Sequence, residues 1–430
     1  MRRRQDVLAR GAPEGSDRSA RGSEALAVSN FRRFFVGQTL SGIGTWFQML
    51  AQGLLVLKLT GSSAALGAVF AVQYTPLLLF GAWSGTLIDR MNVRRLIIAV
   101  SCLAAVQAMV LGVVTSTHLV TVWWVLALSF PLGIAQIFER AAPQAMLREL
   151  VAPDTVPSAV VYTNMVISAG RLVGPALGGF LYATVGPAAC FYVNAVSYSV
   201  VVVSMLMVNK SKLIPRPHQS TPAKMRDGLR FVRSSPLHRR VLITNALIGC
   251  LAMNFPLQIS SMVTFVFHAN GAAFGYAESI NACAAVLTGV VLARRLRSPT
   301  MSSLALACFV FGFALAGNAL APSLTFFYWW MPVFGASVVC YMSMSQTLLQ
   351  QHTPHEMVGR VMSLYMLGAL GTTPIGALIL GTVTDLSSTR ISFAIGATTL
   401  VGCATVLWRL GNVQAPTTTS AVITTVPADT

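Results

Sequence analysis

Long apolar runs alternate along the chain with short polar or basic breaks. Each run is about 20 residues long, the length that an α-helix needs to cross the hydrocarbon core of a bilayer. Only Arg171 and Glu278 are charged within these runs. The pattern predicts twelve membrane-spanning helices over residues 34–57, 64–87, 96–115, 120–138, 158–183, 188–208, 241–266, 272–293, 302–321, 324–345, 361–383 and 391–408.

The longest break separates two sets of six runs. Residues 209–240 are predicted to form a linker on the inner surface, with a short amphipathic helix in which Met225, Leu229 and Val232 recur at helical spacing. We therefore predict two six-helix bundles, residues 33–208 and 241–410. Residues 1–32 and 411–430 are predicted to be a basic and a Thr-rich disordered tail.

The two halves resemble each other at a nearly constant offset. The segment Gly85–Arg90 corresponds to Gly289–Arg294, while Pro153 corresponds to Pro354 and Pro175 to Pro374. Such internal repeats are typical of transporters whose substrate site lies between the halves, near the membrane midplane. The repeat therefore predicts a central cavity.

Composition and charge support a membrane protein. Apolar residues make up 54% of the 430 residues and charged residues only 10%, too little polarity to cover a soluble globule. With the N-terminus inside, every Lys and Arg falls on the inner side except Lys58, Arg390 and Arg171. This bias predicts an inner-membrane protein with both termini cytoplasmic. Nucleic acid is excluded as a partner because the basic residues flank helices and form no single patch, despite a net charge of +17.

Residue types that carry enzyme chemistry have no suitable spacing here. The seven cysteines all fall inside predicted spans, and the six histidines lie at span ends or in loops without matching metal ligands. The phosphate-binding pattern G-x-x-x-x-G-K-[ST] does not occur. We predict no enzyme activity, metal or cofactor, and no use of ATP by this chain.

The loop after the second predicted span reads GTLIDRMNVRR. A charged turn obeying the positive-inside rule is one interpretation. The loop also resembles the signature G-x-L-x-D-R-x-G-R-[RK] of the major facilitator superfamily, although Asn92 replaces its second glycine. The resemblance implies a gate in which an acidic residue caps a helix of the other half and pairs with arginine. The gating residues would be Gly85, Asp89, Arg90 and Arg94.

The fifth predicted span contains GRLVGPALGGFL. Gly170, Gly174 and Gly178 share one helix face that allows close helix contact, and Pro175 lets the helix bend. Ordinary glycine-mediated packing would account for this face. Together with Gly179, the segment is also similar to the Gly-Pro motif of drug:proton antiporters, which implies antiport. We count Gly170, Gly174, Pro175, Gly178 and Gly179 as further candidate gating residues.

A wider resemblance covers residues 31–410. The segments FRRFFVGQTLSGIGTWF, LTGSSAALGAVF, RDGLRFVRSSPLHRR and VGRVMSLYML look like the enterobactin-exporter branch of the superfamily, and lysophospholipid flippases are near neighbours. The resemblance implies an all-α membrane protein of twelve transmembrane helices in two pseudo-symmetric six-helix bundles, the major facilitator fold. It also implies export.

Polar residues follow single faces of some spans. Gln38, Ser41, Thr45, Gln48 and Gln52 are spaced three or four residues apart, so they lie on one side of the first helix. Such a face must look into protein or a wet cavity, and polar contacts between helices are an equal alternative. Shorter stripes occur in the seventh and eighth spans. The predicted substrate-binding residues are Gln38, Thr45, Gln48, Gln52, Asn254, Gln258, Asn281 and Tyr341.

Four ionisable residues are candidates for proton coupling. They are Glu139 and Arg140 at the inner end of the fourth span, Arg171 in the fifth and Glu278 in the eighth. A carboxylate that moves between water and a low-dielectric cavity can take up and release a proton. We predict that Glu139 carries the proton, with Glu278 as the second choice. A structural ion pair or an interfacial anchor is the alternative.

These observations predict a proton-coupled exporter working by alternating access. Its cargo would be a small amphipathic compound such as a drug, siderophore or secreted metabolite, and its partners would be this cargo, protons and the bilayer. We expect a monomer. A lysophospholipid flippase or passive facilitator would share the fold, and a membrane receptor or scaffold that transports nothing is an alternative of another class.

Overall fold

The first half of the chain forms six long helices. The structure, a computed structural model, describes residues 25–214, 225–296, 298–354 and 356–410, with the backbone alone at 82–86, 89, 225–227 and 410. Tail residues 1–24 and 411–430 lie outside the described residues. The helices of the first half are α2 (Ser29–Thr60), α3 (Ser63–Arg90), α4 (Val93–Ser116), α5 (Val122–Leu150), α6 (Val156–Thr184) and α7 (Pro187–Leu206).

The second half supplies the other spans. A short helix, α8 (Met225–Ser234), precedes them in the chain. They are formed by α9 (Pro236–Leu251), α10 (Phe255–Ser261) with the π-turn η3 (Met262–Val266), α11 (Gly271–Arg295), α12 (Met301–Leu320), α13 (Leu324–Gln351), α14 (Val358–Gly371), α15 (Thr373–Leu386) and α16 (Thr389–Leu410). Twelve segments of the described chain are long and apolar enough to span a membrane, which confirms the predicted number.

Two spans that the sequence predicts as continuous are interrupted. The seventh is divided between α9 and α10, and the eleventh between α14 and α15. Pro256 and Pro374 lie in the first turn of α10 and α15, where a residue without a backbone N–H interrupts no helical hydrogen bond. At the first break the Asn254 side chain donates to the Cys250 carbonyl over 2.7 Å. Hydropathy averaged over a span does not detect these breaks, because apolar neighbours outnumber Asn254, Thr372 and Thr373.

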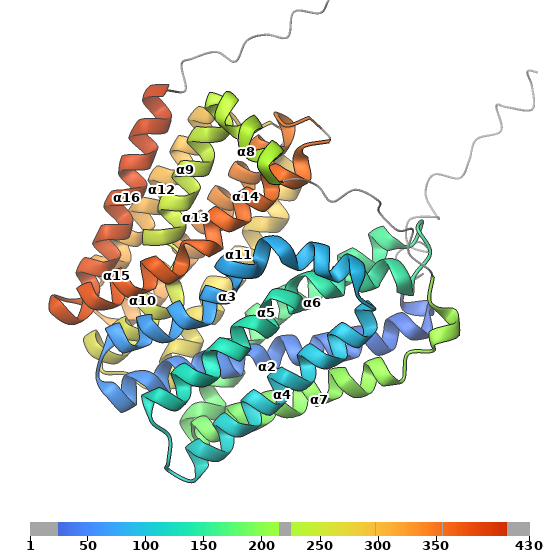
Figure 1. Ribbon diagram of the computed structural model, residues 1–430. Coiled ribbons are helices and arrows are strands. Elements are labelled where there is room, and N and C mark those ends of the chain that lie inside the picture. Colours follow the sequence, from blue (N-terminus) through green and yellow to red (C-terminus); the bar gives the residue numbers. More distant parts are fainter. Residues whose placement is uncertain (1–24, 215–224, 297, 355, 411–430) are drawn as a thin grey trace, which may run out of the picture.

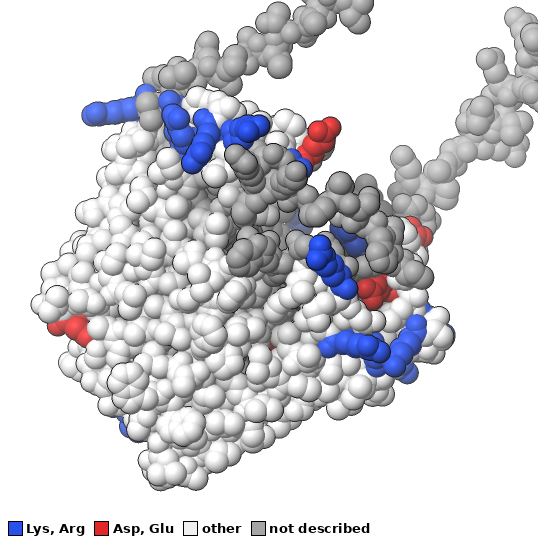
Figure 2. Space-filling view, in the orientation of Figure 1, with Lys and Arg blue, Asp and Glu red and all other residues white. Residues whose placement is uncertain are grey.

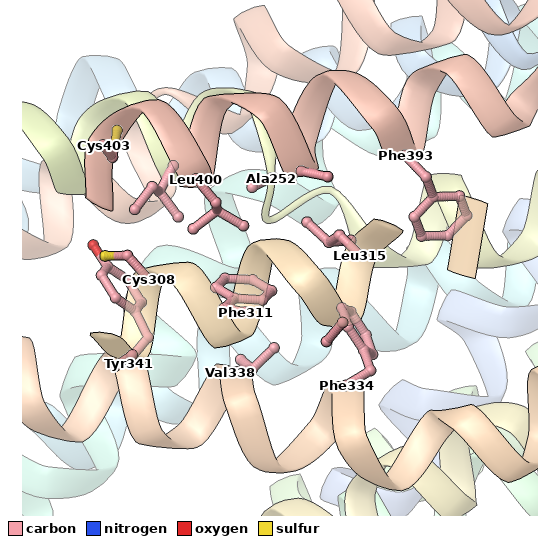
Figure 3. Close-up of a cluster of buried hydrophobic side chains, with 14 of the residues drawn as sticks. Ala252, Cys308, Phe311, Leu315, Phe334, Val338, Tyr341, Phe393, Leu400 and Cys403 are labelled. Atoms are coloured by element: carbon pink, nitrogen blue, oxygen red, sulfur yellow. The ribbon is translucent and has the colours of Figure 1, made fainter. Parts of the chain in front are cut away.

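The helices pack into two bundles that meet along two helix pairs (Figure 1). In the first bundle α2 packs on α6 and α7, α4 on α7, and α3 on α5. In the second, α12 packs between α13 and α16, where Phe311 lies against Phe334, Tyr341 and Leu400 (Figure 3). The most extensive contacts between the bundles are α3 with α15 and α6 with α11, and smaller ones join α3 to α10 and α14 and join α2 to α10 and α11. Any movement of one bundle against the other must therefore change these two pairs.

Much of the surface carries no charged side chain, and many large apolar side chains are exposed on it. On the face seen in Figure 2, Lys and Arg side chains gather toward the upper and right-hand margin and leave a broad white area. Large apolar side chains such as Trp123 and Trp329 are 74% and 80% exposed. Hydrocarbon is the solvent that such a surface prefers.

Twelve crossings place the start of α2 and the end of α16 on the same side of the molecule. We call this the termini side. The other side, where α2 turns into α3 at Gly61 and α15 ends near Ser387, is the opposite side.

Candidate functional site

The first bundle contains a cavity of about 440 Å³ in its termini-side half. Its lining comes from α2, α4, α5, α6 and α7, so among the described residues only the first bundle forms it. Apolar side chains supply much of the wall. The polar lining residues are Gln38, Ser41, Thr45, Ser101, Gln136, Glu139, Arg140, Gln144 and Thr163.

Glu139 is the acidic residue of this cavity. The Tyr198 hydroxyl donates to its Oε2 over 3.4 Å, and the Thr45 hydroxyl oxygen lies 3.3 Å from that of Tyr198. Its other oxygen, Oε1, is buried and has no hydrogen-bond partner among the described residues. Arg140 lines the same cavity and is exposed. Glu139 thus lines the cavity, while its carboxyl group has one direct partner and one buried oxygen that accepts no hydrogen bond from the described residues.

The polar stripe on α2 divides in two. Gln38, Ser41 and Thr45 line the cavity, whereas Gln48 and Gln52 are buried deeper, beyond it. Both glutamines also border a small water-sized void that shares Gln136 with the main cavity. The stripe is therefore partly a cavity lining and partly a contact between helices.

Gln48 and Gln52 belong to a set of buried side-chain hydrogen bonds among five helices. Gln48 Nε2 donates to Gln107 Oε1 over 2.8 Å, and Asn194 Nδ2 donates to Gln48 Oε1 over 2.6 Å. Gln52 Nε2 donates to Gln73 Oε1 over 3.3 Å and to Ser129 Oγ over 3.1 Å. These amides connect α2 to α3, α4, α5 and α7.

The glycine face of α6 lies against α2. A Cβ atom added to Gly174 would come within 2.7 Å of Trp46 Cβ, and one on Gly178 within 3.1 Å of the Phe47 ring. Gly170 faces the backbone of Gly42. These glycines therefore allow two helices of the same bundle to approach closely.

Pro175 and Gly179, on a neighbouring face of α6, contact the other bundle instead. A Cβ on Gly179 would lie 2.7 Å from the Gly271 carbonyl oxygen, and Gly275 Cα is close to the same position. Because Gly179 lies near the end of α6 and Gly271 begins α11, this contact closes the bundles together on the opposite side.

Arg171 and Glu278 lie on the two helices of this contact. The positive charge of Arg171 attracts the Glu278 carboxylate from the other bundle. Glu278 is buried and accepts a hydrogen bond from Asn281 Nδ2 over 3.2 Å, while Arg171 is exposed. The two residues therefore lie on opposite sides of the boundary between the bundles.

The other predicted substrate-binding residues are buried within the second bundle. Asn254 donates to Cys250, as described above, and Gln258 Nε2 donates to the Ser392 carbonyl over 3.2 Å. Tyr341 donates to Asn245 Oδ1 over 3.4 Å. In this conformation the structure does not bring these side chains, or Asn281, to the cavity of the first bundle.

Part of the predicted gating loop lies outside the described side chains, including Gly85 and Asp89. Arg90 is exposed at the end of α3. Arg94 is buried and donates from Nε to the Met205 carbonyl over 2.7 Å and from Nη2 to the Leu206 carbonyl over 3.1 Å. It therefore caps the last turn of α7 in its own bundle.

Two functional candidates escaped sequence reasoning. Tyr198, the hydrogen-bond partner of Glu139, gives no signal because a Tyr in an apolar span is commonly a packing residue. Asp385 near the end of α15 accepts hydrogen bonds from the first residues of α3. A signal for it was available, since it is an isolated acid directly after the eleventh predicted span, on the predicted outer side.

Solved structures share the fold at low sequence identity. The nucleoside transporter NupG matches with a TM-score of 0.69 and 13% identity, covering 90% of this chain and 100% of that one. A bacterial homolog of the human lysosomal transporter Spinster, in an inward-facing and unoccupied conformation, matches with a TM-score of 0.67 and 13% identity, covering 89% and 94%. Both likenesses show the fold alone.

Characterised relatives extend over most of the chain. The staphyloferrin A transporter of Staphylococcus aureus is 23% identical, covering 84% of this chain and 91% of its own length. Macrolide efflux protein A of Streptococcus pyogenes is 23% identical over 86% and 93%. The multidrug efflux pump Tap of Mycolicibacterium fortuitum is 25% identical over 82% and 88%.

The profile of one family covers nearly the whole chain, from residue 23 to residue 425. That span contains all twelve membrane helices, the cavity and both contacts between the bundles. The family's members and the relatives above are transporters and not enzymes. The chain is therefore a multi-pass membrane transporter of the major facilitator superfamily and belongs to its transmembrane secretion effector family.

Proposed function

We propose that this chain is a proton-coupled secondary active exporter of a small amphipathic compound. Relatives that move a siderophore, macrolides or several drugs support export of small molecules. In the proposed cycle the bundles rock about the central region, so that the cavity opens to one side of the membrane at a time. Proton entry down its gradient would drive the cargo out.

The position of Glu139 carries the proposal. It is the acidic residue in the lining of the 440 Å³ cavity, and one of its oxygens has no hydrogen-bond partner among the described residues. A carboxyl group can cross a low-dielectric barrier in its neutral form and lose the proton on reaching water. Tyr198 and Thr45 would hold it in place, and Arg140 would attract its ionised form.

Cargo chemistry follows from the lining. Trp46, Ile97 and Phe138 supply apolar wall, while Gln38, Thr45 and Gln136 supply uncharged hydrogen-bonding groups. Small-molecule sites commonly combine a mostly apolar wall with a few polar groups. A drug-like or siderophore-like compound with apolar and polar parts suits this lining better than a small, strongly charged anion.

Direction and membrane orientation are part of the same proposal. We assign the termini side to the cytoplasm of the inner membrane, since positively charged residues flank the helices there. The cavity lies toward that side and the bundles meet on the other, so the described conformation is the one that loads cargo from the cytoplasm. A single chain contains a complete cavity, in keeping with a monomer.

Gating would use both bundle contacts. Gly179 and Gly275 let α6 and α11 close on the opposite side, with Arg171 and Glu278 adding a charge pair that opening would separate. Asp89 would hold the termini side closed in the other half of the cycle, as the resemblance of its loop implies. Glu278 is the second candidate for the proton carrier.

Replacing Glu139 by Gln tests the coupling. Purified protein in liposomes with an imposed pH gradient is assayed with a macrolide, staphyloferrin A and a lipophilic dye as probes. For the Glu139→Gln variant we expect gradient-driven accumulation to fall to the level of protein-free liposomes, because the amide cannot release a proton. Exchange of labelled for unlabelled probe at equilibrium should persist, since it requires only the rocking motion.

Asp154→Asn is the matched control, because Asp154 is an exposed acid outside the cavity lining. It should transport as the native protein does. Accumulation by Glu139→Gln against a gradient would remove Glu139 from the role. Transport by the native protein that a protonophore leaves unchanged would point to a passive facilitator or flippase, and no exchange of any probe would point to a receptor or scaffold.

A further inference from the structure

The start of α3 and the end of α15 are joined by a carboxylate on the opposite side of the molecule. Ser62 Oγ donates to Asp385 Oδ2 over 2.5 Å, the Ser63 backbone N–H to Oδ1 over 2.6 Å, and the Ala64 backbone N–H to Oδ2 over 3.0 Å. Both oxygens of Asp385 are therefore used, and all three donors belong to the other bundle.

The chemistry of this contact favours an ionised acid. The first backbone N–H groups of a helix have no partner within the helix, and its N-terminus carries partial positive charge. Hydrogen bonds to a carboxylate are stronger than those between neutral groups. Among the described residues no other Asp or Glu lies at a helix end on this side, so no second acid could replace Asp385.

Small residues of α3 also make close contacts with α10 and α15 near the Asp385 carboxylate. The hydroxyl oxygens of Ser63 and Ser261 are 2.8 Å apart, which joins α3 to α10. A Cβ on Gly381 would lie 3.1 Å from Ala64 Cα, and Gly67 faces the Ala377 carbonyl with no room for a side chain. Separation of the bundles on this side must break the three hydrogen bonds to Asp385 before it can open these contacts.

We propose that Asp385 is an external latch, a gating residue that holds the exit side of the transporter closed while cargo is loaded from the other side. The latch is made and broken once in each cycle, since α3 and α15 belong to different bundles. It lies at the end of α15 as Asp89 lies at the end of α3, so each bundle would contribute one acid to the closure of one side. This inference rests on the alternating access of the proposed function, and not on proton coupling.

Hydrogen–deuterium exchange of the full chain in lipid nanodiscs tests the latch. We compare the native protein with Asp385→Asn, which keeps the shape but loses the charge and one acceptor oxygen. Exchange of amides at 63–66 should rise about tenfold, since hydrogen bonds to a charged group are lost. The segment 271–275, which faces α6 and donates no hydrogen bond to Asp385, should also exchange faster, because the whole side opens.

Hydrogen exchange in the second segment, 271–275, distinguishes a latch between the bundles from a local cap on α3. If exchange rises at 63–66 but stays native at 271–275, Asp385 only caps α3 and the proposal is wrong. It is equally wrong if neither segment changes. Asp154→Asn, the matched acid on the termini side, should leave both segments as in the native protein.

Asp385→Glu, which restores the charge on a longer side chain, should return exchange at both segments toward the native rate. Such a recovery would also show that misfolding of the protein does not explain the faster exchange in Asp385→Asn. The result does not depend on transport, so a failure of the Glu139 experiment would leave it standing, and the reverse also holds.

Discussion

Amide side chains account for much of the buried polarity in the first bundle. Gln48 and Asn194 are 2% and 0% exposed. Asn194 donates a hydrogen bond to Gln48, which in turn donates one to Gln107. A buried polar group that loses its partner keeps the full cost of leaving water. Residues of this kind fix how α2, α4 and α7 sit against one another, whereas those facing the cavity remain available to cargo.

Replacing Gln48 by Leu should destabilise the protein. Asn194 Nδ2 and Gln107 Oε1 would both lose their partner, at a cost of about 1–3 kcal/mol for an unsatisfied buried group. Thermal unfolding in detergent, followed by tryptophan fluorescence, should show a lower midpoint for Gln48→Leu. Gln38→Leu, which alters a cavity-lining residue of the same helix, should unfold near the native midpoint and instead weaken probe binding. Equal midpoints for Gln48→Leu and the native protein would contradict this assignment.

Glycines decide how closely helices approach, and different faces of one helix serve different contacts. On α6, Gly174 and Gly178 face α2 within the bundle, while Gly179 faces α11 across the boundary. Substitution on the first face should disturb folding of the bundle. Substitution on the second should disturb only the conformations in which the opposite side is closed.

Gly275→Val tests the boundary face. The added side chain would run into the Pro175 carbonyl and lie close to Gly179, so α6 and α11 could no longer close. We expect faster hydrogen exchange in 271–275 and loss of probe transport, with the thermal midpoint changed less than in Gly174→Val.

Gly402→Val is the control, because nothing lies within 4 Å of a Cβ at Gly402 on α16. Both changes introduce the same β-branched residue into a helix, so a difference between them measures the contact. If both variants transport alike, the close contact of α6 and α11 is not required.

At the scale of the whole molecule, two bundles meet along α3 with α15 and α6 with α11, and the apolar surface surrounds both. The cavity lies on the termini side and the latch on the other. The proposed orientation therefore determines which solution supplies the cargo and which receives it.

Labelling with a membrane-impermeant maleimide tests this orientation. In intact cells Ser388→Cys, between α15 and α16, should be labelled, and Met91→Cys, between α3 and α4, should be labelled only after lysis. The native chain gives the background, since its seven cysteines all lie in the helices. The reverse pattern would place the termini outside and would turn the proposed exporter into an importer.

The sequence by itself determined the membrane class, the number of spans and the family. The membrane class and the number of spans follow from the free energy of transferring each segment into lipid, which depends on local composition and needs no knowledge of contacts. The family follows from the resemblance of short motifs such as GTLIDRMNVRR. It also singled out the polar face of α2 and the glycine face of α6, because helical spacing alone brings those residues together. The sequence also pointed to Glu139, because acids are rare near the ends of spans. The structure shows that Glu139 lines a cavity, and its role in proton coupling stays a prediction.

Only the tertiary structure decided which polar residues face a cavity and which bond to one another. Gln38 and Gln48 lie on the same stripe, yet one lines the cavity and the other bonds to Gln107 and Asn194. Ser62 and Asp385 are 323 positions apart, and no local pattern relates them. Partners across such distances depend on how the bundles pack, because a hydrogen bond needs its two atoms in place and not merely residues of a suitable kind.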